Sequence, residues 1–220
     1  MTIDTIQLDN ALPRVFRDSQ GGTAVAGSQV WLSQLTFSRP ESYMVAAASG
    51  AGKSSLCSFI YGNRNDYEGR ILFNGVDIRS FSVDTWCAIR RESLALLPQE
   101  MRVFPELTAM DNVLLKNRLT DRFTAAEIRR MFDRLDMSDK ADVAAGHLSV
   151  GQQQRVAIIR SLCQPFSFIL LDEPVSHLDE RNNRAAAALI TEIAAAQQAS
   201  IIATSVGNPL SIDNFKALSL

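Results

Sequence analysis

The sequence predicts an α/β fold built on a largely parallel β-sheet. Short apolar runs alternate with segments of helical periodicity, which is typical of strands connected by helices. From about residue 100 to 162 the pattern is helical and has no clear strand. A length of 220 residues suits one domain that carries a subdomain. We therefore expect a single domain over residues 1–220, with a helical subdomain at approximately 100–162 inserted between sheet strands.

The expected elements follow from local patterns. Apolar runs of strand length lie at 43–47, 70–73, 94–97, 168–172 and 201–204. Helical periodicity lies between them, at 53–61, 83–91, 125–135, 152–162 and 183–197. Two capping-box sequences, Thr124 with Glu127 and Ser149 with Gln152, indicate where two of the helices begin.

The composition excludes several classes of protein. The formal net charge is −2, so the chain as a whole has no electrostatic attraction for nucleic acid. The three cysteines are odd in number and lack the spacing of a metal site, as expected for reduced thiols in a cytosolic protein. No apolar run approaches the ~20 residues of a membrane span. Any membrane role is therefore expected to come through a partner.

A glycine-rich segment after the run at 43–47 has the context of a phosphate-binding P-loop, because a helix follows it. Its backbone N–H groups can converge on phosphate where glycines allow tight turns, and the helix dipole points at the same anion. Lys53 is expected to neutralise the β- and γ-phosphates, and the Ser54 hydroxyl to bind Mg²⁺. Ala47 stands where the strict pattern has its first glycine. An ordinary glycine-rich loop is the alternative. The candidate residues are Ser49, Gly50, Ala51, Gly52, Lys53, Ser54 and Ser55.

Two acidic residues end the apolar run at 166–171. An Asp at the carboxyl end of a buried parallel strand is well placed to hold Mg²⁺ beside a P-loop, and Asp172 takes this role. Glu173 is the expected general base for an attacking water. The alternative is a strand-to-turn junction with two solvated acids.

The segment HLSVGQQQR at 147–155 contains a second candidate anion site. The capping box of Ser149 with Gln152 places a helix start there, with free N–H groups and the positive end of the dipole. Gly151 leaves the backbone bare beside the Ser149 hydroxyl. Because the P-loop already supplies one phosphate site, the second is best explained by a nucleotide held by another copy of the chain.

Four segments together resemble the ATP-binding cassette (ABC) ATPase domain: the P-loop, LSVGQQQR at 148–155, LLDEP at 170–174 and SHLD at 176–179. They occur in the family's order and spacing, and the resemblance covers essentially the whole chain. It implies a P-loop NTPase fold of the ABC type, in which an antiparallel β part accompanies the parallel core sheet. It also implies ATP and Mg²⁺ as ligands, a second copy of the chain in an ATP-sandwich dimer, and a separately encoded transmembrane permease. The implied location is the cytoplasmic face of the inner membrane.

The resemblance also assigns roles to single residues. Gln99, in LLPQE, resembles the glutamine that touches Mg²⁺ and senses the membrane partner. Phe16 occupies the position of an aromatic residue that stacks on adenine, with core packing as the alternative. Asp179 belongs to the loop that links the two ATP sites across the dimer. The segment GQQQRVAI at 151–158 and the spacing from Phe16 to Lys53 are similar to the lipoprotein-releasing, macrolide-export and cell-division branch, in which 19–29 forms a hairpin loop.

Two positions depart from the family pattern. Ser205 stands where members usually have a histidine that contacts the γ-phosphate, and Val150 where they most often have glycine. A hydrogen bond to a charged group contributes about 1.5–3 kcal/mol, so its loss slows turnover roughly ten- to hundredfold. Because Ser205 keeps a donor, the smaller effect is expected. His147 and His177 are expected to be exposed loop residues. The sequence therefore predicts an active but slow ATPase.

The leading hypothesis is an ATP-hydrolysing subunit of an ABC transporter or of a membrane-spanning transmission complex. The alternative is a nucleotide-gated scaffold that dimerises on ATP and hydrolyses it weakly, because Ser205 replaces the usual histidine. A third class, an ABC ATPase acting on DNA or ribosomes, is disfavoured because the chain lacks coiled-coil heptads, a second cassette and basic patches.

Overall fold

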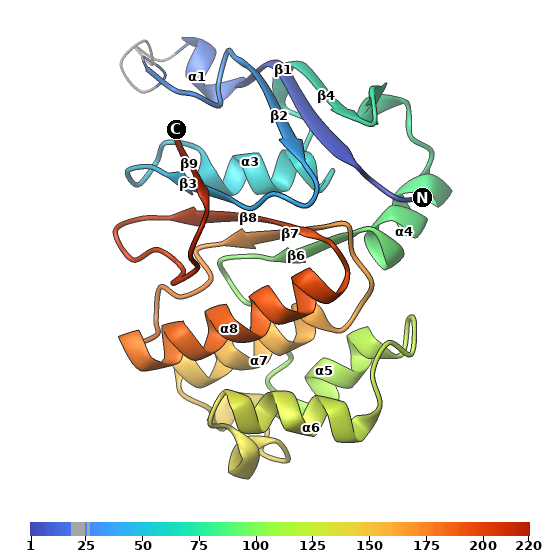
Figure 1. Ribbon diagram of the computed structural model, residues 1–220, viewed down its shortest axis with the longest axis vertical. Helices are drawn as coiled ribbons and strands as arrows, with labels where there is room; N and C mark the ends of the chain where they lie inside the picture. The colour runs from blue at the N-terminus through green and yellow to red at the C-terminus, as the bar shows by residue number, and fades with distance from the viewer. Residues whose placement is uncertain (19–24, 26) are drawn as a thin grey trace.

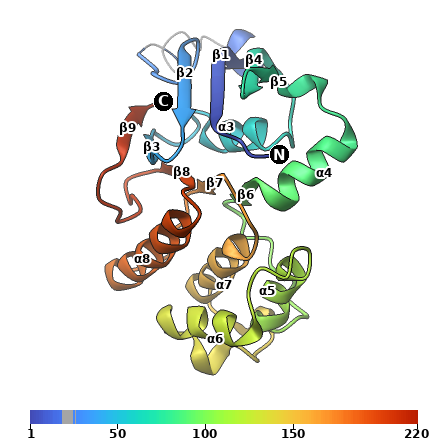
Figure 2. The same cartoon turned by 45° about the vertical axis from the view of Figure 1, so that its right-hand side comes forward.

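The computed structural model describes residues 1–18, 25 and 27–220, and it confirms the predicted α/β class (Figure 1). The expected hairpin loop at 19–29 falls largely on residues 19–24 and 26, which lie outside the described residues. The described part contains a parallel sheet, an antiparallel sheet and helices. The two sheets lie on either side of helix α3 (Lys53–Ile60), as both views show (Figures 1 and 2).

A parallel sheet forms the centre of the fold. Among the described residues it has five strands in the order β6-β7-β8-β3-β9. They are β3 (Tyr43–Ala46), β6 (Leu94–Leu97), β7 (Phe168–Asp172), β8 (Ser200–Ser205) and β9 (Lys216–Ser219). The first four match the predicted runs to within one residue at either end. The edge strand β9 was not predicted, because its four residues are mostly exposed and form no apolar run.

The central strands of the parallel sheet are buried on both faces, as strand β7 illustrates. Ile169 and Leu171 pack into the hydrophobic cluster on the side of the helices α7 (Val150–Leu162) and α8 (Glu180–Ala196). Phe168 and Leu170 pack into the cluster on the side of α3 and the antiparallel sheet. A strand buried on both faces is apolar at every position. The first polar side chain of the run is therefore Asp172, at the carboxyl end of the strand.

The antiparallel sheet has the order β2-β1-β4-β5 within the described residues. Its strands are β1 (Thr5–Pro13), β2 (Gln34–Ser38), β4 (Tyr67–Phe73) and β5 (Val76–Asp77). Only part of β4 was predicted as a strand. In β1 the pairing with β4 shifts between Asp9 and Leu12, and Asn10 has a left-handed backbone. Such a bulge interrupts the polar–apolar alternation by which a half-buried strand is recognised.

The remaining helices among the described residues are α1 (Val15–Asp18), α4 (Val83–Glu92), α5 (Ala109–Asn117) and α6 (Ala125–Arg134), with short turns η1 (Ile78–Ser80), η2 (Ser138–Lys140) and η3 (Ala145–His147). Of these, α5 and α6 lie beyond α7, away from both sheets, as Figure 2 shows. Helix α7 begins two residues before its predicted start and α8 three residues before, because Ser149 and Asp179 are their caps. In the ranges that the structure describes, no helix combines the length and apolarity needed to cross a membrane.

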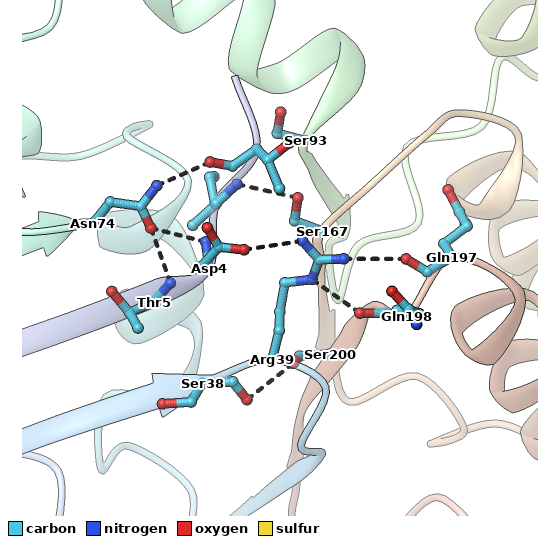
Figure 3. Close-up of polar contacts among 12 residues, drawn as sticks. Asp4, Thr5, Ser38, Arg39, Asn74, Ser93, Ser167, Gln197, Gln198 and Ser200 are labelled. Atoms are coloured by element: carbon cyan, nitrogen blue, oxygen red, sulfur yellow. Dashed lines mark hydrogen bonds and ion pairs between the residues drawn. The ribbon is translucent and has the colours of Figure 1, made fainter.

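Arg39, which follows β2, links the antiparallel sheet to the segment after helix α8 (Figure 3). Its guanidinium donates to the backbone carbonyls of Gln197 and Gln198, at 3.2 and 2.9 Å, and pairs with Asp4 at 3.3 Å. The two carbonyls follow the end of α8, where the helix dipole favours a cation. The hydroxyl of Ser200 also donates to the carbonyl of Ser38, at 3.3 Å. These contacts hold the two layers in register at the end of α8.

Candidate functional site

The glycine-rich loop joins β3 to α3, and its glycines are required by its backbone. Gly52 is the N-cap of α3 with a φ of 97°, and Gly50 has a φ of 82°. Both values lie in the left-handed region that favours glycine. A Cβ on Gly52 would also lie 3.1 Å from the Phe16 ring and 3.2 Å from the Trp31 ring. The loop can therefore turn tightly and still pack against two aromatic side chains.

Lys53, the first residue of α3, is 5% exposed and lies inside this loop. Its ammonium donates to the carbonyls of Ala48 and Ala47, at 2.8 and 3.2 Å. The same Nζ lies 3.8 Å from a carboxylate oxygen of Glu173. The positive charge is thus fixed between the loop and the acid, at the start of a helix whose dipole attracts anions.

A cavity of about 250 Å³ opens beside Lys53. The Ser54 hydroxyl donates to Gln99 Oε1 at 3.4 Å, and Gln99 Nε2 donates to Glu173 Oε2 at 3.4 Å. The loop, the glutamine after β6 and the acid after β7 therefore meet in one place, although they are far apart in the chain. All residues that line the cavity belong to the predicted set: Ser49, Gly50, Gly52, Lys53, Ser54, Ser55, Gln99 and Glu173.

The oxygen atoms around the cavity suit a magnesium ion. Mg²⁺ prefers oxygen ligands and is usually held by one or two protein groups together with phosphates and waters. Ser54 and Gln99 present a hydroxyl and an amide oxygen to the cavity. Asp172, at the carboxyl end of β7, is buried. The described residues contain no group of three or more His, Cys, Asp and Glu able to hold a metal alone.

Thr204, on β8, organises both acids and was not among the predicted residues. Its hydroxyl donates to Asp172 Oδ1 at 2.8 Å and accepts from the backbone N–H of Glu173 at 3.1 Å. Thr204 lies opposite Asp172 in the parallel pairing of β7 with β8. The sequence signal for it is weak, a hydroxyl at the end of an apolar run, and only the strand order turns that signal into a contact.

Glu173 itself has an unusual backbone. Its φ is 51°, in the region that side chains rarely adopt, and its side chain is 16% exposed. Such strain persists only where surrounding contacts hold it. Besides Thr204, the buried amide of Gln154 donates to the Glu173 carbonyl at 3.2 Å. Gln154 was also missed, because the run of three glutamines does not indicate which of them points inward.

Phe16 lies on α1, half-buried, with its ring over Gly52. The predicted adenine-stacking position is thus next to the P-loop. Trp31, which was not predicted, lies beside it, and its indole N–H donates to the Ala51 carbonyl at 3.1 Å. Ala51 itself does not line the cavity within the described residues. Its carbonyl anchors the loop to the core.

The predicted residues of the second anion site and of the cross-dimer loop also do not line this cavity within the described part: Ser149, Gly151, Gln152 and Asp179. Ser149 caps α7, since its hydroxyl accepts from Gln152 N–H at 3.3 Å while the Gln152 side chain accepts from Ser149 N–H at 2.9 Å. The predicted capping box is confirmed. Asp179 caps α8 and accepts from Asn182 N–H at 2.8 Å, which lowers the pKa of its carboxyl. The Ser149 and Asp179 side chains are exposed, each at the start of its helix.

Close packing requires a glycine at position 151, which the sequence alone did not show. A Cβ there would lie 2.9 Å from the carbonyl oxygen of His177. The start of α7 is therefore in close contact with the loop between Glu173 and α8. Val150 beside it is about half exposed. His177 and His147 are exposed, as predicted.

Ser205 ends β8 and is 4% exposed. Its carbonyl accepts from Ala47 N–H at 3.3 Å, so it lies beside the first residue of the P-loop. Its hydroxyl has no hydrogen-bond partner among the described residues, although it is buried. A buried polar atom without a partner is uncommon and calls for an explanation.

Comparisons with known proteins agree with this geometry. The family model for the ABC transporter matches residues 33–176. The lipoprotein-releasing system ATP-binding protein LolD of Shewanella denitrificans is 30% identical over 191 residues, which span 84% of this chain and 79% of LolD. The macrolide export ATP-binding/permease protein MacB of Sodalis glossinidius is 32% identical over 156 residues, 70% of this chain and 24% of MacB.

The fold also has a solved counterpart. The dimeric structure of MJ0796, a bacterial ABC transporter cassette, superposes with a TM-score of 0.78 and 21% identity, over 97% of this chain and 94% of that one. The names of the two relatives match the predicted branch of lipoprotein release and macrolide export. From the family match and these relatives, the chain belongs to the ABC transporter family.

Proposed function

We propose that the chain is the ATP-binding and ATP-hydrolysing subunit of an ABC transporter or a membrane-spanning transmission complex. The observation that carries the proposal is the cavity shared by the P-loop, Gln99 and Glu173. Lys53 supplies positive charge for phosphates, Ser54 and Gln99 supply oxygen ligands for Mg²⁺ together with Asp172, and Glu173 is positioned to accept a proton from water. Bound Mg²⁺ would neutralise phosphate charge.

The arrangement favours a dimer that closes on ATP. Ser149 and Gly151, at the start of α7, are not among the described residues that line the chain's own cavity, and they are exposed and partly exposed, respectively. A free helix N-terminus next to a serine hydroxyl suits the γ-phosphate of a nucleotide bound to a second copy. In this proposal two copies pair head to tail, and Gln152 and Asp179 lie at the same interface. Hydrolysis of ATP, with Glu173 as the general base, reopens the dimer.

The proposed partner is a separately encoded permease, reached through the region after Gln99, and the proposed location is the cytoplasmic face of the inner membrane. Two relatives carry names of transport systems, LolD of lipoprotein release and MacB of macrolide export. Co-purification of a multi-span membrane protein with the tagged chain supports this partner. Recovery of the chain with nucleic acid or ribosomes instead would contradict it.

The deciding experiment measures ATP-dependent dimerisation of the Glu173→Gln protein by light scattering. Removing the proposed base slows hydrolysis, so the dimer accumulates with ATP and Mg²⁺ and dissociates with ADP. Adding Ser149→Arg places a bulky cation in the proposed interface and should abolish the dimer. A dimer that persists with Ser149→Arg would show that Ser149 does not face the partner's nucleotide.

A nucleotide-gated scaffold is the second candidate, and Ser205 favours it. The Ser205 hydroxyl is short and buried, whereas a histidine would reach farther from the same strand end. Steady-state phosphate release distinguishes the two candidates. Activity well above that of the Glu173→Gln variant supports the enzyme. Equal activities, with ATP-dependent dimerisation retained, support the scaffold.

A further inference from the structure

Arg64 lies beside the phosphate cavity although it is outside the P-loop sequence. It follows α3, and its guanidinium is held by Asp66 through two hydrogen bonds, the one from Nε to Oδ1 at 2.9 Å. Its Cζ also lies 5.1 Å from the centre of the Phe59 ring. The hydrogen bond from Arg64 lowers the pKa of Asp66, so the pair stays ionised near neutral pH. The orientation of this guanidinium is therefore fixed from two sides.

The remaining amino group of Arg64 points at the P-loop helix. Nη1 donates to the Ser55 hydroxyl oxygen at 3.0 Å. A guanidinium has no acceptor, so the proton of the Ser55 hydroxyl must point elsewhere. Among the described residues none accepts a hydrogen bond from Ser55, and Ser55 lines the phosphate cavity. The contact with Arg64 thus orients a free O–H donor towards the cavity.

The usual internal acceptor for this proton already has one donor. A serine in a helix often donates to the carbonyl four residues earlier, which here belongs to Ala51. That carbonyl accepts from the Trp31 indole at 3.1 Å. Because no described residue accepts from Ser55 and its hydroxyl lines the cavity, a ligand oxygen there is the acceptor that suits it.

The position of Arg64 indicates which phosphate is involved. Ser54 faces Gln99, at the end of the cavity where Glu173 lies. Ser55 faces Arg64 instead. Asp66, which holds Arg64, accepts through its carbonyl from Arg14 N–H at 3.0 Å, and Arg14 is two residues before Phe16. Ser55 is thus on the side of the predicted adenine site, where the α-phosphate of a nucleotide bound in the proposed way would lie.

We propose that Arg64 is a positioning residue for nucleotide binding, which directs the Ser55 hydroxyl to a non-bridging oxygen of the α-phosphate. The proposal rests on the proposed ATP-binding function of the same cavity. A purely structural Arg64 would instead only fasten the end of α3 to Asp66. The two roles differ in what the loss of Arg64 does to nucleotide affinity when Ser55 is already absent.

The test is a double-mutant cycle of Arg64→Met and Ser55→Ala, with ADP binding measured by calorimetry. A hydrogen bond to phosphate is strong, so Ser55→Ala should weaken binding about tenfold and Arg64→Met about three- to tenfold. In the Ser55→Ala protein, Arg64→Met should weaken binding no further. The matched control is Arg17→Met, because Arg17 is an exposed arginine paired with Glu68 and, in the part of the chain that the structure describes, bonds to no cavity residue.

The two diastereomers of ADPαS give a second readout, because each carries sulfur in place of one α-phosphate oxygen. The unmodified chain and Arg17→Met should distinguish the diastereomers, whereas Ser55→Ala and Arg64→Met should lose most of that preference. In steady-state hydrolysis, Arg64→Met should raise KM and leave kcat nearly unchanged. A lower melting temperature in Arg64→Met with unchanged ADP affinity and preference would overturn the proposal.

Additive losses in the cycle would overturn it equally, since Arg64 would then act without Ser55. Absence of nucleotide binding by the unmodified chain would be a different failure. That result contradicts the proposed ATP-binding function itself, and this inference with it. The two failures are therefore distinguished by the first titration of the unmodified chain.

Discussion

The buried amide of Gln154 joins the start of α7 to the catalytic candidate Glu173. Its Nε2 donates to the Glu173 carbonyl at 3.2 Å, and its Oε1 accepts from His177 N–H at 3.0 Å. Gln154 is 2% exposed, so water does not replace these bonds when they are lost. One side chain thus couples the helix proposed to contact the partner's nucleotide with the acid proposed to activate water.

Gln154→Leu should destabilise the protein and slow phosphate release. Leucine keeps most of the volume but removes one of the two donors to the Glu173 carbonyl, which still accepts from Ser176 N–H at 3.4 Å. It leaves the His177 N–H without its partner among the described residues, which lowers the free energy of unfolding by about 1–3 kcal/mol. Denaturant unfolding and steady-state phosphate release measure the two effects. Gln153→Leu is the control, because Gln153 donates to Ala145 and Leu148 and not to Glu173. Equal phosphate release in both variants would contradict the coupling.

Thr204→Val should reduce both stability and phosphate release, although the two side chains have nearly the same volume. Valine has the same shape, but it leaves a buried Asp172 oxygen and the Glu173 N–H without the Thr204 hydroxyl. We expect the free energy of unfolding to fall by about 1–3 kcal/mol, and phosphate release to fall with it. Thr204→Ser keeps the hydroxyl and should retain most of the activity. If valine and serine variants hydrolyse ATP equally well, the hydroxyl does not position the acids.

Gly151→Ala should weaken ATP-dependent dimerisation. The added methyl group would lie 2.9 Å from the His177 carbonyl, so either α7 or the loop before α8 must shift. Light scattering of the Glu173→Gln, Gly151→Ala protein measures the effect. Val150→Ala, one residue away and exposed, is the comparison, since it changes the same helix start without adding a contact with the His177 carbonyl. Normal dimerisation with alanine at 151 would show that this close contact is not needed.

Ser205→Ala separates a structural serine from a catalytic one. The buried Ser205 hydroxyl has no partner among the described residues, so removing it should leave stability unchanged or raise it by up to about 1 kcal/mol. If the hydroxyl contacts the γ-phosphate, phosphate release falls in the same variant. Thermal unfolding and phosphate release measured together decide between the roles. A clear loss of stability would mean that the hydroxyl has a partner in the folded chain.

Asp179 should make the start of α8 sensitive to acid. The hydrogen bond from Asn182 N–H lowers the pKa of this carboxyl in the folded state. A lowered folded-state pKa stabilises the fold above the ordinary pKa of Asp, and this contribution is lost as the pH falls through the folded value. Asn caps helices about as well as Asp. The melting temperature of Asp179→Asn should therefore fall less on acidification than that of the unmodified chain.

Much of the parallel core could be predicted because its information is local. Strand β7 is buried on both faces, so FILL is apolar at every position, and the capping box of Ser149 depends on one residue three positions on. The antiparallel strands have no such signal. Strand β1 is interrupted at Asn10, and β9 is a mostly exposed edge.

The same distinction holds for the candidate site. The P-loop is contiguous, so its residues can be read from the sequence together. Thr204 and Gln154 act on the acids from other elements, and their contacts exist only because β8 lies beside β7 and α7 packs next to the loop after it. The solitary hydroxyl of Ser205 likewise depends on its burial, which no local pattern shows.

The contact between Trp31 and the P-loop makes Trp31 an intrinsic fluorescent probe of the loop. The Trp31 indole is buried, bonded to the Ala51 carbonyl and close to Gly52. The sequence has two tryptophans, and the other, Trp86, lies on α4 away from this loop. In a Trp86→Phe protein the remaining indole emission would come from beneath the loop alone. Any rearrangement of the loop by a ligand would then be visible in unlabelled protein, in real time.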